Sequence, residues 1–268
     1  MDSSVPTTRL FAGLGDGWII VRRDLAHLRY APSQLAGQLI FPAIMVVLFG
    51  YIFGSAVQAP GGNYREYLMP GLFAFAQITA AASAALATAD DAARGVMDRL
   101  RSMPIARSAV PFGRVGSELA TGILNLVVLI ACGLLVGWQP HRGPGDTTAA
   151  FALLLLMRYA FSWIGVYLGL LVKNPATADS LVPLSFPIAM LSNGFVPTSG
   201  MPSWLQAIAN YNPISCLVQA TRQLFGNPTV AATAWPLQHP ILASLAWTLL
   251  IIAIFTPLAV HRYRTAHL

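Results

Sequence analysis

The chain has 268 residues, of which 56% are hydrophobic and only 10% are charged, and its formal net charge is +6 at neutral pH. This number of charged residues is too small to cover the surface of a water-soluble protein. The composition therefore excludes a soluble globular domain and indicates an integral membrane protein. Anionic lipid headgroups account for the basic excess more simply than nucleic acid does, and we expect no nucleic-acid partner.

The N-terminal region is expected to lie on the membrane surface rather than to cross it. Between residues 14 and 28 apolar side chains recur at helical spacing, with arginines beside them. This pattern predicts an interfacial helix over 9–30, and the alternative is an irregular basic tail. The residues assigned to this helix are Trp18, Arg22, Arg23, Leu25 and Arg29. The segment lacks the pattern of a cleaved secretory signal, so we expect the first span to stay in the mature protein.

Apolar stretches long enough to cross a bilayer as helices follow along the chain. They predict about six spans, at 35–57, 68–89, 115–138, 149–172, 177–195 and 241–260. None alternates as a membrane strand does, so the expected fold is an all-α transmembrane domain over residues 1–268. The fifth stretch carries Pro183 and Pro187 and continues into a polar, proline-rich stretch. It predicts a short span followed by a re-entrant or interfacial segment at 196–222.

The basic residues are distributed unevenly between the loops on the two sides of these spans. Arginine and lysine in short loops are retained in the cytoplasm, so the side that holds most of them is expected to be cytoplasmic, with both termini. That side holds Arg9, Arg22, Arg23, Arg29, Arg94, Arg99, Arg101, Arg107, Arg114, Lys173, Arg262 and Arg264, whereas Arg65, Arg142 and Arg222 fall on the other.

A charged loop at 90–112 separates two long apolar runs on the expected cytoplasmic side. After Gly95, one face of a short helix would carry Val96, Leu100 and Met103, and Pro104 would end it. The side chains expected to face water or a partner are Asp98, Arg99 and Arg101. An amphipathic helix of this kind is suited to docking a cytoplasmic protein, and the alternative is an ordinary charged loop.

Groups that carry chemistry are sparse. The single lysine, Lys173, follows no glycine-rich loop, so the chain cannot build a P-loop ATP site, and energy must come from elsewhere. The five histidines and two cysteines form no catalytic or metal-binding pattern, so we expect no enzyme activity, no metal and no cofactor on this chain. Arg158 lies inside a predicted span, where it either contacts a substrate or pairs with a neighbouring helix.

Two motifs resemble the permeases of type-2 ABC exporters, particularly the daunorubicin-resistance-like branch of drug efflux systems. The stretch RGVMDRLRSMPIARSAVPFGR at 94–114 is similar to the family's cytoplasmic coupling helix, and SNGFVPTSGMPSWLQAIANYNPIS at 192–215 is similar to its external signature. The stretch at 22–54 also resembles the family's interfacial helix and first span, so the resemblance covers nearly the whole chain.

The resemblance implies a homodimer or close heterodimer in the bacterial cell membrane, bound to two copies of an ATP-binding subunit that carry ATP and Mg²⁺. It implies that Gly95, Val96, Asp98, Arg99, Leu100, Arg101 and Pro104 couple the ATPase to the spans. It also implies external re-entrant helices shaped by Asn193, Pro197, Gly200, Pro202, Trp204, Asn212 and Pro213.

The expected function is therefore export of a lipophilic drug or natural product, as in multidrug efflux and antibiotic resistance. Spans dominated by Ala, Leu and Val favour a lipophilic substrate over a lipid-linked saccharide or lipid, the first alternative. A membrane anchor or assembly subunit without transport activity is the second alternative.

Overall fold

The computed structural model describes residues 40–41, 43–53, 63–97, 99, 108–172, 174–229 and 234–265. Helices account for nearly all of the regular structure in these ranges, which contain no strand. The predicted all-α membrane fold is therefore confirmed. The predicted interfacial helix at 9–30 lies outside the described residues.

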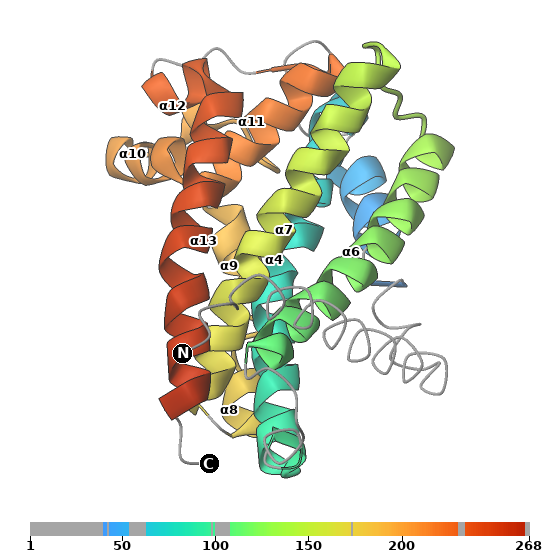
Figure 1. Ribbon diagram of the computed structural model, residues 1–268. Helices are drawn as coiled ribbons and strands as arrows, with labels where there is room; N and C mark the ends of the chain where they lie inside the picture. The colour runs from blue at the N-terminus through green and yellow to red at the C-terminus, as the bar shows by residue number, and fades with distance from the viewer. Residues whose placement is uncertain are drawn as a thin grey trace, which may run out of the picture.

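Four long helices form the body of the protein: α4 (Tyr64–Ala93), α6 (Ala109–Val136), α7 (Pro144–Val172) and α13 (Pro240–Thr265). Each is long and apolar enough to cross a membrane. Figure 1 shows them running alongside one another, with α7 in the middle of the bundle. The protein is a multi-pass membrane protein.

Small residues let α4 and α7 approach each other closely. A Cβ atom on Gly165 would lie 2.2 Å from the Ala81 carbonyl oxygen, and one on Gly169 would lie 2.5 Å from the Ala85 carbonyl oxygen. Glycines spaced four residues apart on one helix, facing alanines on the next, are typical of tightly packed membrane helices, because apolar lipid gives no hydrophobic drive for association. This contact brings α7, which carries the buried Arg158, against α4.

The predicted spans at 35–57 and 177–195 are less regular. In the described part of the first, an apolar helix at Ala43–Ile52 overlaps the π-helix η1 (Leu48–Phe53). The second is divided into α8 (Pro175–Asp179) and α9 (Ser185–Met190), joined by turns, and ends in further turns at 191–196. Proline removes an N–H donor and restricts the preceding residue, so Pro183 and Pro187 are compatible with this break.

Short helices follow these turns: η2 (Thr198–Gly200), α10 (Ser203–Tyr211), α11 (Pro213–Phe225) and α12 (Trp235–Gln238). In Figure 1, α10 lies across the direction of α13, whereas α11 lies against α13 and α7 at the end of the bundle where α7 begins. An aromatic cluster packs around the C-terminal end of α11. In it, the rings of Phe73, Trp138, Phe151 and Phe225 contact one another.

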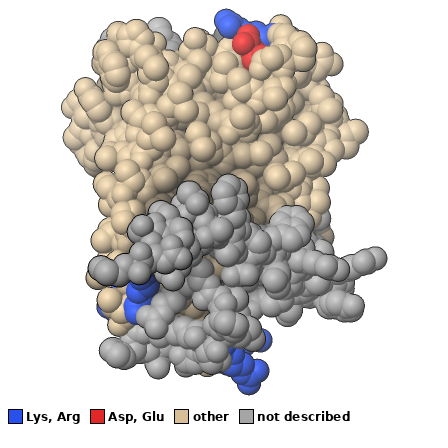
Figure 2. All heavy atoms as spheres, in the orientation of Figure 1, with Lys and Arg blue, Asp and Glu red and all other residues tan. Residues whose placement is uncertain are grey.

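Apart from the buried Arg158 and Glu118, most described charged residues gather at the two ends of the bundle. Glu66 pairs with His141 at 3.1 Å and Arg142 pairs with Asp146 at 3.7 Å at the end where α4 and α7 begin. The opposite end holds Asp90, Asp91, Arg94, Arg114, Arg262 and Arg264. Figure 2 shows blue and red atoms at the upper end of this face and blue atoms near the lower end, with the described surface below the upper end in tan. This distribution is that of a membrane-spanning bundle.

Candidate functional site

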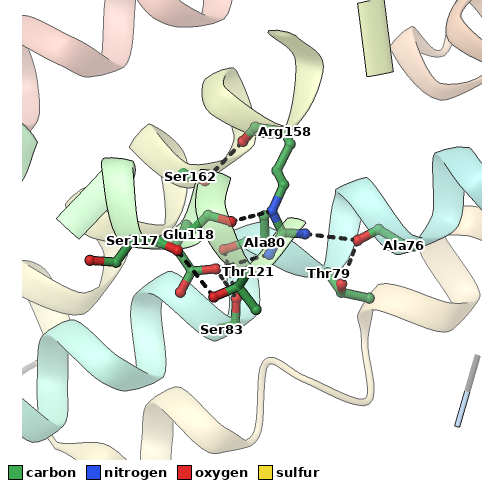
Figure 3. A network of polar contacts seen from close by, with 9 residues as sticks. All are labelled: Ala76, Thr79, Ala80, Ser83, Ser117, Glu118, Thr121, Arg158 and Ser162. Carbon is green, nitrogen blue, oxygen red and sulfur yellow. Dashed lines mark hydrogen bonds and ion pairs between the residues drawn. The ribbon is translucent and has the colours of Figure 1, made fainter. Parts of the chain in front are cut away.

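A buried polar network joins three of the long helices (Figure 3). The Arg158 side chain on α7 is only 2% exposed. Its Nε donates to the Glu118 carbonyl oxygen at 2.6 Å, and its Nη2 reaches Glu118 Oε2 at 3.2 Å. Its Nη1 donates to the Ala76 carbonyl oxygen at 3.1 Å. A single guanidinium therefore bonds to both α6 and α4.

The Glu118 carboxylate has a second partner in this network. Ser83 on α4 donates its hydroxyl to Glu118 Oε2 at 2.7 Å, so the same oxygen receives a charged and a neutral hydrogen bond. The nearby hydroxyls of Ser117, Thr121 and Ser162 instead donate to carbonyl oxygens of their own helices. Buried charges are tolerated in a bilayer when they are paired in this way.

Gly122 on α6 makes room for the arginine. A Cβ atom at this position would lie 2.0 Å from Arg158 Cδ and 2.2 Å from Nε. The arginine side chain thus passes directly over the glycine backbone on its way to Glu118. These contacts are those of pairing between helices, one of the two roles expected for Arg158; a substrate contact stays a prediction.

Arg222 on α11 is a second buried arginine, and its side chain is fully buried. Its place at the end of the predicted external segment at 196–222 gives no sign of this burial, because the surrounding stretch is polar and rich in proline. Its Nε and Nη2 donate to the Tyr67 carbonyl oxygen at 3.0 and 2.8 Å, and Nη2 also donates to the Gly194 carbonyl oxygen at 3.0 Å. The guanidinium carbon lies 3.6 Å from the centre of the Tyr67 ring, a cation–π contact.

The turn at 192–195, where the stretch similar to the family's external signature begins, is held against α4 by further bonds. Tyr67 donates its hydroxyl to the Asn193 carbonyl oxygen at 2.9 Å, and Tyr64 donates to the Phe195 carbonyl oxygen at 3.1 Å. A Cβ atom on Gly71 would lie 2.2 Å from the Gly194 carbonyl oxygen, so the two backbones are in direct contact. We call Tyr64, Tyr67, Gly71, Gly194 and Arg222 the turn clamp.

Asn212 connects the far part of the external segment to the same turn. Its Oδ1 accepts from the Ile214 N–H at 2.9 Å and so caps α11, while its Nδ2 donates to the Leu191 carbonyl oxygen at 2.9 Å. Pro213 occupies the first turn of α11, where its missing N–H costs nothing. Of the predicted external residues, Asn193, Asn212 and Pro213 are thus gathered at this turn.

The other predicted external residues lie along the connection to α10. Pro197 and Gly200 border and end η2, and Pro202 immediately precedes α10. Trp204 lies on the exposed face of α10, away from the turn clamp.

The predicted coupling residues are only partly described. Gly95 follows α4 with a φ of 66°, a left-handed conformation that favours glycine and ends the helix. Val96 and Arg99 follow in helical conformation, and the Arg99 N–H donates to the Gly95 carbonyl oxygen at 3.3 Å. Asp98, Leu100, Arg101 and Pro104 lie outside the described residues, as do all the residues assigned to the interfacial helix.

Ion pairs surround this helix end. Arg94 contacts Asp90 at 2.9 Å, one turn back on α4, and Arg114 on α6 lies 3.8 Å from Asp91. The described part of the predicted coupling loop therefore begins at the basic end of the bundle, beside the start of α6.

Comparison with known proteins identifies relatives of this chain. The chain is 27% identical over 244 residues to the daunorubicin resistance ABC transporter permease protein DrrB1 of Streptomyces coeruleorubidus, covering 90% of this chain and 83% of the relative. It is 28% identical over 278 residues to the doxorubicin resistance ABC transporter permease protein DrrB of Mycobacterium tuberculosis, covering 97% and 93%. A family model described as ABC-2 type transporter matches residues 16–225. This match takes in the buried network, the turn clamp and the predicted coupling loop, and the chain belongs to the ABC-2 type transporter family.

Proposed function

We propose that this chain is the membrane-spanning subunit of an ATP-driven exporter that moves a lipophilic drug or natural product out of the cell. The observation that carries the proposal is the family match over 16–225, together with two relatives that are named for daunorubicin and doxorubicin resistance and aligned over at least 90% of this chain. The long apolar helices supply the membrane path that such a subunit requires.

The energy source in this proposal is a separate ATP-binding subunit. Members of the ABC-2 family are the transmembrane components of their transporters, and the single lysine of this chain follows no phosphate-binding loop. ATP and Mg²⁺ would therefore bind to the partner. We propose two copies of that partner beneath a homodimer or close heterodimer of the permease.

The coupling contact is proposed at the basic end of the bundle, in the loop that starts at Gly95. The positive charges there support a cytoplasmic location in a bacterial cell membrane, with both termini on that side. An ATPase docked to this loop would bear directly on α4 and α6, the helices that the loop connects. Arg158 and Glu118 would then transmit displacement of either helix to α7 because their bonds join all three.

The substrate is proposed to be lipophilic because each of the two arginines described inside the bundle is already bonded to neighbouring groups of the protein. Arg158 bonds to Glu118 and Ala76, and Arg222 bonds to Tyr67 and Gly194. Two alternatives remain: export of a lipid-linked saccharide or lipid, and a role as a membrane anchor without transport. The experiment below distinguishes both from drug export.

The experiment is efflux from cells that express the chain with its ATP-binding subunit. Export of an anthracycline dye is expected only when both subunits are present and the ATPase is catalytically intact. Charge reversal in the coupling loop, Asp98→Arg or Arg101→Glu, should reduce co-purification of the ATPase or uncouple hydrolysis from efflux. Arg142→Glu, the matched change at the opposite end, should do neither. Normal ATPase binding without efflux of any drug would support the lipid, saccharide or anchor alternatives instead.

A further inference from the structure

Two amide side chains inside the bundle each have an oxygen atom without a donor in the described part of the chain. The Gln77 side chain on α4 is fully buried, and its Nε2 donates to the Phe73 carbonyl oxygen at 3.2 Å, but its Oε1 has no donor among the described residues. Asn125 on α6 is 9% exposed, and its Oδ1 is buried without a donor there as well. We call Gln77 and Asn125 the orphan amides. A buried acceptor without a donor is unfavourable, and a bilayer supplies no water to replace the donor.

Contacts between α4 and α6 place the orphan amides at the same level of the bundle. Toward one end, Ser83 on α4 bonds to Glu118 on α6. Toward the other end, a Cβ atom on Gly133 of α6 would lie 2.7 Å from Met69 Cε on α4. The two helices therefore run antiparallel. Counting seven residues along α6 and six along α4 from the first contact, or eight along both from the second, leads to the orphan amides.

Asn125 lies on the α6 face that carries the buried charge pair. It follows Glu118 by seven residues and Gly122 by three, a spacing that places all three on one side of the helix. The Arg158 side chain passes directly over Gly122 on its way to Glu118. Asn125 therefore faces the region between α4 and α7, one turn beyond Gly122.

Gln77 lies on the α4 face that packs against α7. It precedes Ala81 by one helical turn, and a Cβ atom on Gly165 of α7 would lie 2.2 Å from the Ala81 carbonyl oxygen. The residue before it, Ala76, accepts the Nη1 bond of Arg158 (Figure 3). The orphan amides and the Arg158 guanidinium thus occupy one layer of the bundle, to which α4, α6 and α7 each contribute a polar side chain.

We propose that the orphan amides form a binding site for a neutral hydroxyl group on a lipophilic substrate, with Gln77 Oε1 and Asn125 Oδ1 as the acceptors. An unsatisfied acceptor requires a donor, and the positive charge of Arg158 in the same layer disfavours an ammonium group. The apolar helices around the layer favour a lipophilic alcohol or phenol over a saccharide. The inference rests on the proposed export of a lipophilic compound and specifies which group of that compound is recognised.

Both acceptors are covered by protein, so the hydroxyl group reaches them when α6 moves relative to α4, and binding is measured without nucleotide and with a non-hydrolysable ATP analogue. The experiment uses nanodiscs that contain the permease with its ATP-binding subunit, and two uncharged fluorescent probes, 1-pyrenemethanol and its methyl ether. The ether keeps the ring system but has no hydroxyl proton to donate. Saturable energy transfer from tryptophan to pyrene reports binding. In at least one nucleotide state the alcohol should bind about two- to tenfold more tightly than the ether, as expected for one neutral hydrogen bond.

Gln77→Met and Asn125→Leu approximately keep the side-chain size and remove the acceptor. Either variant should lower the affinity for the alcohol toward that for the ether and leave the affinity for the ether unchanged. Equal affinity of the wild-type protein for the two probes in both nucleotide states would overturn the proposal. An equal loss for both probes in the variants, or a preference for the alcohol that survives both substitutions, would overturn it too. Failure of the proposed export is seen separately, because the same subunits in sealed vesicles would then not transport an anthracycline, whichever probe they bind.

Thermal stability without any probe gives an independent measurement. Because Oδ1 of Asn125 has no donor in the described part of the chain, Asn125→Leu should leave the thermal midpoint unchanged or raise it. The matched control is Asn227→Leu, which should lower the midpoint. Asn227 accepts from Trp138 Nε1 at 2.9 Å and donates to the Gln139 carbonyl oxygen at 3.2 Å. A loss in Asn125→Leu as large as that in the control would show that this amide is bonded within the protein, and would overturn the proposal.

Discussion

Arg158 on α7 crosses the backbone of Gly122 on α6 so closely that a Cβ atom there would lie 2.0 Å from Arg158 Cδ. Because Gly122 has no side chain, the buried Arg158 can reach Glu118, which lies one turn before Gly122 on α6. The geometry makes the glycine as necessary to the network as the charged groups are.

Gly122→Ala should destabilise the bundle. The added methyl group must displace the Arg158 guanidinium, and disrupting a buried ion pair costs on the order of 3–5 kcal/mol. The measurement is the thermal midpoint at which detergent-solubilised protein loses its monodisperse elution peak. Gly145→Ala is the matched control on α7, because a Cβ atom there meets nothing within 4 Å. A midpoint for Gly122→Ala equal to that of the control would show that Arg158 does not occupy this position.

The pair Arg158 and Glu118 should show strong coupling in a double-mutant cycle. Glu118→Gln leaves a buried guanidinium without its counter-charge, and Arg158→Gln leaves the carboxylate with only the Ser83 hydroxyl. The double variant, which has neither charge, should be more stable than the sum of the single effects predicts, by roughly 0.5–3 kcal/mol. Additive losses in thermal stability would contradict a direct interaction.

Sequence patterns could predict the apolar helices and the gathering of charge at loops because both follow from the cost of placing charge in lipid. They also placed Arg158 inside a span. They could not identify its partners, since Ala76 and Glu118 lie on two other helices and meet Arg158 only through packing. The burial of Arg222 could not be predicted for a related reason: it depends on the carbonyl groups of Tyr67 and Gly194, which no side-chain pattern reveals.

Arg222→Lys should loosen the turn clamp while keeping the positive charge. Lysine cannot reproduce the guanidinium fork that bonds both carbonyl oxygens, and hydrogen bonds from charged groups are worth about 1.5–3 kcal/mol. Faster hydrogen exchange at amides in 191–195 is expected, with little change in α7. Arg142→Lys provides the comparison, since that exposed arginine pairs with Asp146 at the surface. Unchanged hydrogen exchange at 191–195 in Arg222→Lys would show that the arginine does not hold the turn.

Both ends of the bundle can be assigned to a side of the membrane by cysteine labelling in a background without Cys132 and Cys216. A membrane-impermeant maleimide should label Asp146→Cys in intact cells but should reach Asp98→Cys or Arg264→Cys only after permeabilisation. This result follows from the retention of basic loops in the cytoplasm. The reverse labelling pattern would show that the topology is inverted, and the proposed ATPase contact would then lie on the wrong side of the membrane.

Transport into sealed vesicles tests the central claim most directly. Vesicles containing the purified chain with its ATP-binding subunit, oriented with the nucleotide sites outward, should accumulate an anthracycline on addition of ATP and Mg²⁺. Vesicles with the chain alone should neither hydrolyse ATP nor accumulate the drug, because the coupling requires both subunits. ATP hydrolysis by the isolated chain, or drug accumulation without the ATP-binding subunit, would contradict its assignment as the permease of an ATP-driven exporter.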